Sequence, residues 1–206
     1  MKPFVKETGT VAVLDRVNVD TDQIIPAKYL KRIERSGYGP FLFHSWRFLE
    51  DGTPNQNFEL NRPEYEGATI LVAGKNFGCG SSREHAVWAL QGYGFRAIIA
   101  PSFAEIFHRN CFQNGVLPIS IPEKTCKVIA QRAASSKGYQ LTIDLRNERL
   151  VDSIELDTTF MVHNDPETNK FYIHCLLNGL DEISLTLEHS DKIARYEESI
   201  SRQKYA

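Results

Sequence analysis

Residues 74 to 86, which read GKNFGCGSSREHA, gather three glycines, two serines, an arginine, a glutamate and a histidine directly after the apolar run ATILVA. Glycines let the backbone turn sharply and leave its N–H groups uncovered. A helix that begins here would direct its unpaired amides and its positive dipole end at the same point. Arg83 adds a guanidinium group that suits a carboxylate or a phosphate. The segment therefore favours a small acidic ligand.

The same residues also allow a purely structural role. Ser81, Ser82, Arg83 and Glu84 fit the capping-box pattern, in which a serine oxygen accepts a backbone amide and the glutamate reaches back. A hydroxyl held by its own helix is less free to meet a ligand, so the two roles compete at Ser81 unless Ser82 provides the cap. Cys79 is a candidate thiolate near the helix start, but no motif pairs it with a base, and inert packing is the alternative.

The turn lacks the fingerprints of common nucleotide and hydrolase sites. No GK[ST] follows the glycines and GxGxxG is not matched, which disfavours phosphate-binding and dinucleotide-binding loops. The serine-hydrolase pattern GxSxG fails at both serines. The cysteines are scattered and include no CxxC pair, so we expect reduced thiols and no metal or cluster site in this chain: Cys79, Cys111, Cys126 and Cys175.

Short apolar runs without polar alternation predict strands that are covered on both faces. They lie at 10–14, 68–73 and 97–100, with a fourth at 116–121. Amphipathic helices are expected between them, one from Ser81 or Ser82 to Gly92 or Gly94 and one from Ser102 to Gly115. The alternation of strand and helix predicts an α/β fold with right-handed crossovers and a mostly parallel sheet.

The remaining segments differ in character. Residues 122–135 predict a third helix, residues 139–157 a hairpin of half-exposed antiparallel strands, and residues 170–180 and 190–203 two further helices. The connection from 26 to 67 has no clear periodicity, and connections of that length are usually functional or poorly ordered. We expect a single domain over 1–206, with this long loop and a C-terminal helical appendage over about 168–206.

The composition is that of an ordinary globular protein, with 42% hydrophobic and 24% charged residues among 206. The net charge of −2 gives no overall field that favours nucleic acid or an anionic membrane. No apolar stretch approaches the roughly 20 residues that span a bilayer, and the first residues lack the apolar region of a signal peptide. We therefore expect a cytoplasmic protein with a small or a protein ligand.

Three blocks of sequence resemble the family of 3-isopropylmalate dehydratase small subunits, relatives of the fourth domain of aconitase. GKNFGCGSSREHA is similar to the family's signature, DRVNVDTDQIIPAKYLKR at 15–32 to its N-terminal segment, and FAEIFHRNCFQNGVLPI at 103–119 to the helix and strand that follow. The resemblance implies a swivelling β/β/α domain. It also implies a hydro-lyase of leucine biosynthesis, which isomerises 2-isopropylmalate to 3-isopropylmalate by dehydration and rehydration and is active only with a large subunit.

The resemblance assigns roles within a shared site. The large subunit would carry an iron–sulfur cluster, one iron acting as a Lewis acid on the substrate hydroxyl, and this chain would bind no cofactor. Ser81 would be the catalytic base, Arg83 would bind a substrate carboxylate and Ser82 would support the same site. Because a serine hydroxyl is a poor base, this role requires the amides, the helix N-terminus and Arg83 to stabilise the alkoxide.

Thr21 and Asp22 match the TD segment of aconitase-type proteins, in which the acid contributes to the polar network of the active site. An Asx-type turn is the alternative for this pair. His85 is a candidate proton donor, and a helix-face residue oriented by local hydrogen bonds is the alternative.

A basic segment follows, in the region that resembles the family's specificity region. Tyr29, Leu30 and Lys31 are candidates to contact the substrate, and either Lys31 or Arg32 stands near the place of aconitase's substrate-binding arginine. A solvated basic helix face is the alternative. The aromatic residues at 41–48 are expected to pack the long loop or to give the partner interface apolar surface.

Two other functions fit the same turn. A small subunit of a related hydro-lyase that acts on citramalate or homoaconitate would share it. A stand-alone anion-binding or regulatory module would use Ser81 only as a helix cap.

Overall fold

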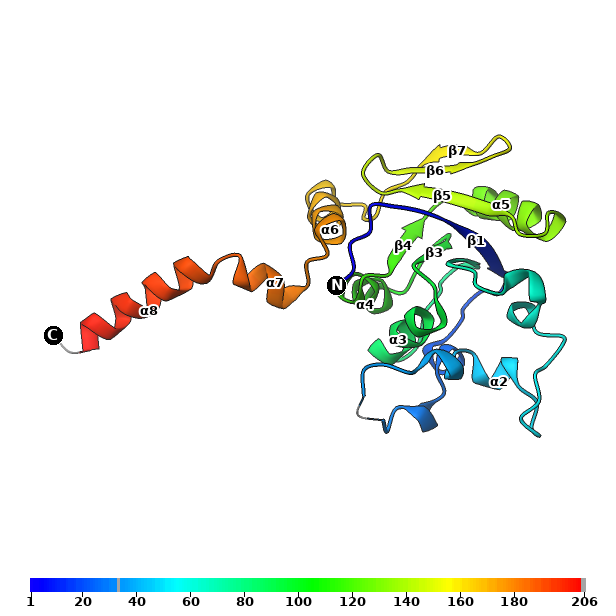
Figure 1. Cartoon of the computed structure of the whole chain (residues 1–206), viewed down its shortest axis with the longest axis horizontal. Helices are drawn as coiled ribbons and strands as arrows, with labels where there is room; N and C mark the ends of the chain where they lie inside the picture. The colour runs from blue at the N-terminus through cyan, green and yellow to red at the C-terminus, as the bar shows by residue number, and fades with distance from the viewer. Residues whose placement is uncertain (33, 205–206) are drawn as a thin grey trace.

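A computed structural model describes residues 1–32 and 34–204, and its centre is a seven-stranded sheet with the strand order β4-β3-β2-β1-β5-β6-β7 (Figure 1). Neighbouring strands pair in parallel from β1 (Lys6–Leu14) through β2 (Ile70–Ala73) and β3 (Ala97–Ala100) to β4 (Leu117–Ser120). On the other side of β1 the pairing is antiparallel, through β5 (Gln140–Asp144), β6 (Arg149–Asp152) and β7 (Asp157–Thr159). The predicted α/β class, with a parallel core and added antiparallel strands, is confirmed.

The sheet separates two hydrophobic cores because side chains alternate between its faces. Along β2, Leu71 packs into the first core with α3 (Glu84–Tyr93) and α4 (Glu105–Asn114). Ile70 and Val72 face the second core, which includes residues of α5 (Glu123–Ser135). Every residue of β2 and β3 is buried, as their unbroken apolar runs predict.

The predicted helix starts at Ser81 or Ser82 and at Ser102 are wrong by a few residues. Arg83 is extended, with φ −134° and ψ 103°, and α3 begins only at Glu84. The Ser102 hydroxyl accepts the backbone N–H of Asn76 at 3.0 Å, so it braces the glycine-rich turn and does not cap α4. In both cases a contact with a distant segment replaces the local cap.

The connection over 26–67, described apart from residue 33, is a packed series of short helices: η1 (Ala27–Tyr29), η2 (Gly39–Phe41), α2 (His44–Arg47), η3 (Glu59–Asn61) and η4 (Pro63–Tyr65). It is preceded by α1 (Thr21–Ile24). Leu42, Phe43 and Phe58 are buried in the first core. The prediction of apolar surface around 41–48 is therefore wrong for Leu42 and Phe43, which pack the loop.

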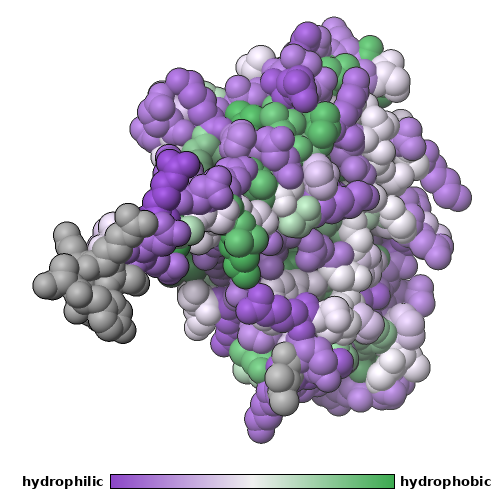
Figure 2. Space-filling view, turned by 60° about the vertical axis from the view of Figure 1, so that its left-hand side comes forward, coloured by the Kyte–Doolittle hydropathy of each residue, from purple (hydrophilic) through white to green (hydrophobic). Residues whose placement is uncertain are grey.

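The C-terminal segment contains α6 (Pro166–Asn178), α7 (Glu182–Leu187) and α8 (Ser190–Lys204). Leu176 of α6 packs into the second core, whereas α7 and α8 extend away from the sheet (Figure 1). Much of the surface is hydrophilic in Figure 2, with hydrophobic residues in scattered groups. Ile193, Tyr196 and Ile200 of α8 are exposed, so nothing in the described part of the chain covers the apolar side of this helix.

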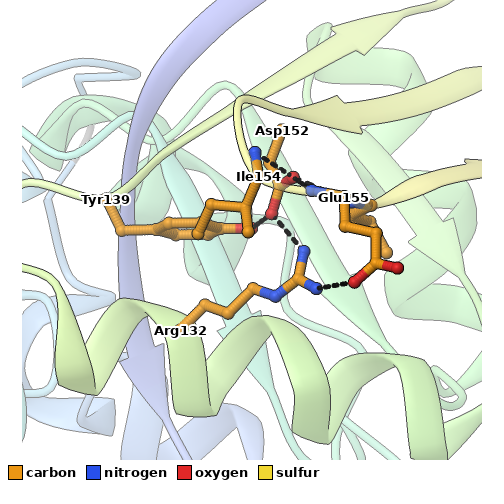
Figure 3. Close-up of polar contacts among 6 residues, drawn as sticks. Arg132, Tyr139, Asp152, Ile154 and Glu155 are labelled. Carbon is orange, nitrogen blue, oxygen red and sulfur yellow. Dashed lines mark hydrogen bonds and ion pairs between the residues drawn. The ribbon is translucent and has the colours of Figure 1, made fainter.

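The antiparallel strands are anchored to α5 by the carboxylate of Asp152, whose side chain is completely buried (Figure 3). Arg132 of α5 and the Tyr139 hydroxyl both donate to Oδ2, each at 2.6 Å. Oδ1 accepts the backbone N–H groups of residues 154, 155 and 156 at 2.8 to 2.9 Å. Burial alone would raise the pKa of Asp152, but the Tyr139 hydroxyl, the guanidinium and the amides together hold the pKa well below its ordinary value.

Replacing Asp152 by asparagine removes the charge at the centre of this network. We expect Asp152→Asn to lower the free energy of unfolding by about 1.5–3 kcal/mol, the usual contribution of hydrogen bonds to a charged group. Asp157→Asn is the matched control, because Asp157 pairs with Arg149 at an exposed site and such pairs contribute about 0–1 kcal/mol. Urea unfolding of the full chain measures both values, and equal losses would contradict the role of Asp152.

The low pKa of Asp152 also predicts how stability depends on pH. An aspartate in the unfolded chain titrates near about pH 3.9, whereas the folded carboxylate keeps its charge to lower pH. This stabilisation is therefore present above about pH 4 and is lost as the pH falls from there toward the folded pKa. Below about pH 4, the free energy of unfolding should fall less steeply in Asp152→Asn than in the wild-type chain. Parallel curves would show that Asp152 is not a source of the acid sensitivity.

Candidate active site

The turn between β2 and α3 is joined to the segment that follows β1. The N–H of Gly78 donates to the carbonyl of Val19 at 2.9 Å, and the N–H of Thr21 donates to the carbonyl of Cys79 at 2.9 Å. The hydroxyl of Thr21 donates to the carbonyl of Ser81, 60 positions away, at 2.8 Å. The structure thus brings together the two motifs that the sequence singles out.

Two glycines of the turn are required by close approach as well as by backbone conformation. Gly78 has φ +76°, and a Cβ there would lie 2.1 Å from Cγ of Phe107 on α4. Gly80 has φ +88°, and a Cβ there would lie 2.1 Å from Oδ2 of Asp20. Any larger residue would push the turn away from α4 or from α1, so the glycines fix where Ser81 lies.

The predicted capping box does not form. Glu84 does not reach back to Ser81 but accepts a hydrogen bond from Nδ2 of Asn114, at the end of α4, at 2.9 Å. Ser81 and Ser82 lie before the helix and are exposed, and their hydroxyl groups have no hydrogen-bond partner among residues 1–32 and 34–204. The Ser81 oxygen is therefore free to meet a ligand.

Several donors belong to the residues around this hydroxyl. In the described structure the backbone N–H groups of Ser81, Ser82 and Arg83 find no acceptor. The first turn of α3 adds its unpaired amides and the positive end of its dipole. Nη1 of Arg83 forms an ion pair with Asp22, which holds the guanidinium group beside the turn. The arrangement is suited to an anion or to an oxygen that gains negative charge.

An open cavity of about 220 Å³ lies against these groups. It is lined by the turn, by Thr21 and by residues 104 to 107 at the start of α4. Ile106, on the lining, is 54% exposed, so apolar surface accompanies the polar groups. Complete small-molecule sites usually enclose roughly 300–1,000 Å³, and this cavity is smaller than that range.

The candidate substrate-contacting residues of the basic segment, at 29–32, lie outside the lining of this cavity. Tyr29 stacks on Phe41 with ring centroids 4.2 Å apart, and the Arg32 guanidinium lies 5.3 Å from the same ring. Leu30 packs partly buried against the first core, and Lys31 is exposed. None of these four side chains lines the cavity, and their contact with substrate stays a prediction.

His85 also lies outside the lining of the cavity. Its ring packs between Trp88, with centroids 4.5 Å apart, and Tyr38, with centroids 5.4 Å apart. Burial, together with the charge of Arg83, lowers the pKa of His85. This placement favours the helix-face alternative over a proton donor.

Sequence reasoning missed Asp20 and the contribution of α4. Asp20 caps α1 by accepting the N–H of Asp22 at 2.7 Å, while its own N–H donates to Gln23 at 2.9 Å. The spacing D-x-x-Q at 20–23 is a capping-box signal that would have indicated this short helix. The lining by Ile106 and Phe107 depends on tertiary packing and has no local signal.

The described residues contain no group of three or more His, Cys, Asp or Glu side chains placed to hold a metal ion. Cys111, Cys126 and Cys175 are buried, and Cys79 is partly buried. Burial and the nearby charge of Asp20 raise the pKa of the Cys79 thiol, which disfavours a thiolate nucleophile. No helix among those described is long and apolar enough to cross a membrane.

Comparison with protein families places the fold in a class. Residues 1–124 match the family described as "Aconitase C-terminal domain". Residues 182–204, which include the whole of α7 and α8, match a second family, described as the C-terminal domain of the 3-isopropylmalate dehydratase small subunit. The chain is thus a domain of the aconitase C-terminal class.

Proteins that are similar over nearly the whole chain identify the family within this class. The 3-isopropylmalate dehydratase small subunit of Brevibacillus brevis is 56% identical over 96% of this chain and 98% of its own length. That of Rhodopirellula baltica is 55% identical over 97% and 99%. The crystal structure titled 3-isopropylmalate dehydratase from Methanocaldococcus jannaschii superimposes with a TM-score of 0.63, at 26% identity, over 93% of this chain and 99% of that one. The chain belongs to the family of 3-isopropylmalate dehydratase small subunits.

The close approach of Gly78 to Phe107 gives a test of the turn. We expect Gly78→Ala to lower the free energy of unfolding by about 1–3 kcal/mol more than Gly138→Ala does. Gly138 has a similar φ of +72° but nothing within 4 Å of its would-be Cβ, so it reports the backbone strain alone. Urea unfolding of the two variants measures the difference. Equal losses would mean that Phe107 yields to the methyl group and does not fix the turn.

Proposed function

We propose that this chain is the small subunit of a two-chain 3-isopropylmalate dehydratase and that it supplies a proton-transferring serine and a carboxylate-binding arginine to a shared active site. The observation that carries the proposal is the exposed Ser81 hydroxyl, unpaired within the described residues and lying on the cavity beside Arg83. Membership of the small-subunit family supports the reaction class. The absence of the predicted capping box removes the reason to treat Ser81 as a helix cap only.

In this proposal Ser81 moves a proton to and from carbon. Its oxygen takes the proton from the substrate carbon in the dehydration half-reaction and returns a proton to carbon in the hydration half-reaction. The backbone N–H groups of residues 81 to 83, which find no acceptor in the described structure, and the N-terminus of α3 would stabilise the alkoxide that this role requires. The stabilising electric field would come from backbone groups that are already in place, so these groups would reorganise little during the proton transfer.

Arg83 would bind a carboxylate of the substrate. Its side chain is only 14% exposed, and Asp22 engages Nη1. The Nε and Nη2 groups make no hydrogen bond within the described residues, so an edge of the fork remains for a second carboxylate. Asp22 thus holds the guanidinium group in one orientation before the substrate arrives, which reduces the entropy lost on binding.

The partner in this proposal is the large subunit that the small-subunit names imply. The cavity is open and smaller than a complete small-molecule site, which supports a second chain as the opposite wall. We place the iron–sulfur cluster on that large subunit, as the resemblance implies. The substrate is a small hydroxy-dicarboxylate, and the cytoplasm is the proposed location.

The decisive experiment combines this chain with its coexpressed large subunit and follows the absorbance of the alkene intermediate. We expect Ser81→Ala to lower kcat by about 10²–10⁴-fold, the usual contribution of a general base. Ser153→Ala is the control, because Ser153 is an exposed serine of the turn between β6 and β7. Size-exclusion chromatography should show that both variants still assemble with the large subunit.

Three outcomes would contradict the proposal. Turnover by the isolated wild-type chain would remove the need for a partner, and full activity of Ser81→Ala would remove the serine from the chemistry. A higher kcat/KM with citramalate or homoaconitate than with isopropylmalate would assign the chain to the related hydro-lyases.

A further inference from the structure

Thr21 is a buried polar residue, with 1% of its surface exposed. Its hydroxyl donates to the Ser81 carbonyl at 2.8 Å, and its backbone N–H donates to the Cys79 carbonyl at 2.9 Å. Thr21 therefore binds the turn on both sides of Gly80, the residue with φ +88°. A glycine leaves the backbone of the turn conformationally flexible, and these two hydrogen bonds restrict that flexibility.

We propose that Thr21 is a positioning residue that sets the geometry of Ser81, and that it does not bind the substrate. The inference rests on the proposed function of Ser81. A threonine hydroxyl has one proton to donate, and in this structure that proton is directed at the Ser81 carbonyl. With 1% exposure, the side chain has almost no surface to offer a ligand.

The contact matters because residues 81 and 82 have no other anchor. Within the described structure the bond from Thr21 is the only hydrogen bond made by either serine. Without it, the two exposed residues would be held only by their neighbours Gly80 and Arg83. A displacement of about 1 Å at a reacting group can lower a rate by about 100-fold, so this single bond has a large effect on the catalyst.

The same bond also aims a donor. The carbonyl of Ser81 and the N–H of Ser82 belong to one planar trans peptide and point in opposite directions. Since the carbonyl points toward the buried Thr21, the N–H of Ser82 points away from it, and it has no acceptor in the described part of the chain. Thr21 thus orients two groups. One is the backbone N–H of Ser82, which would stabilise negative charge, and the other is Ser81, whose oxygen would acquire that charge.

The support under Thr21 is rigid enough for this task. It begins α1, which the Asp20 and Gln23 side chains cap reciprocally. Ile24, three residues on, is completely buried in the first core. The Thr21 hydroxyl is therefore fixed relative to the sheet. Its hydrogen bond to the Ser81 carbonyl in turn fixes the position of the glycine-rich turn.

The test compares Thr21→Val, which removes the hydroxyl but keeps the shape, with Thr21→Ser, which keeps the hydroxyl. In the assembled enzyme we expect Thr21→Val to lower kcat by about 10- to 100-fold with KM changed less than about threefold. Thr21→Ser should retain kcat within about threefold. Thr186→Val is the matched control, because its hydroxyl donates to the Glu182 carbonyl at 2.9 Å at an exposed place on α7.

A second measurement uses the full chain without its partner. Backbone ¹⁵N order parameters at Ser81 and Ser82 should fall from about 0.85 in the wild-type chain to below about 0.6 in Thr21→Val, and should stay high in Thr21→Ser. If the valine variant does not fold, Thr21→Ala replaces it in both measurements.

Unchanged order at the two serines in Thr21→Val would overturn the proposal, as would equal loss of kcat in the valine and serine variants, which would indicate packing of the methyl group. A change in KM alone would show that Thr21 binds substrate. If the wild-type complex has no activity, the proposed function fails, whereas the order parameters still decide whether Thr21 holds the turn.

Discussion

The site depends on the pairing between the segments that leave β1 and β2, two neighbouring parallel strands. Hydrogen bonds from Gly78 to Val19 and from Thr21 to Cys79 join these segments beyond the sheet. Neighbouring parallel strands deliver their carboxyl ends to one edge, where ligands of open α/β sheets usually bind. Without this pairing, the anion-binding turn and the α1 segment would be two independent loops.

The two hydrophobic cores support different parts of the molecule. The first core, beneath α3, α4 and the long connection, supports the turn, because Phe107 packs against Gly78 and Asn114 holds Glu84. The second core, with α5, α6 and the antiparallel strands, contains the buried Asp152 network at its margin. Both cores contribute to stability, and the candidate site is supported by the first core.

Much of the fold could be predicted from the sequence, because buried parallel strands have unbroken apolar runs and the hairpin alternates. The glycine-rich turn and its link with Thr21 and Asp22 were also predictable, the first from local chemistry and the second from resemblance. The start of α3 was not, because Asn114, distant in sequence, takes the glutamate that the capping box needs. The burial of Leu42 and Phe43 likewise arises from tertiary packing, which no local period reveals.

The C-terminal helix α8 differs from the rest of the molecule in how its helical state is maintained. An isolated helix of about 15 residues is marginal in water, and nothing in the described part of the chain covers the apolar side of α8. Heating should therefore reduce the helicity of α8 gradually and independently of the rest of the molecule, whereas α7 is held to α4 by the hydrogen bond from Gln113 to Glu182 at 2.7 Å. The helix content of α8 should therefore depend on what surrounds this segment.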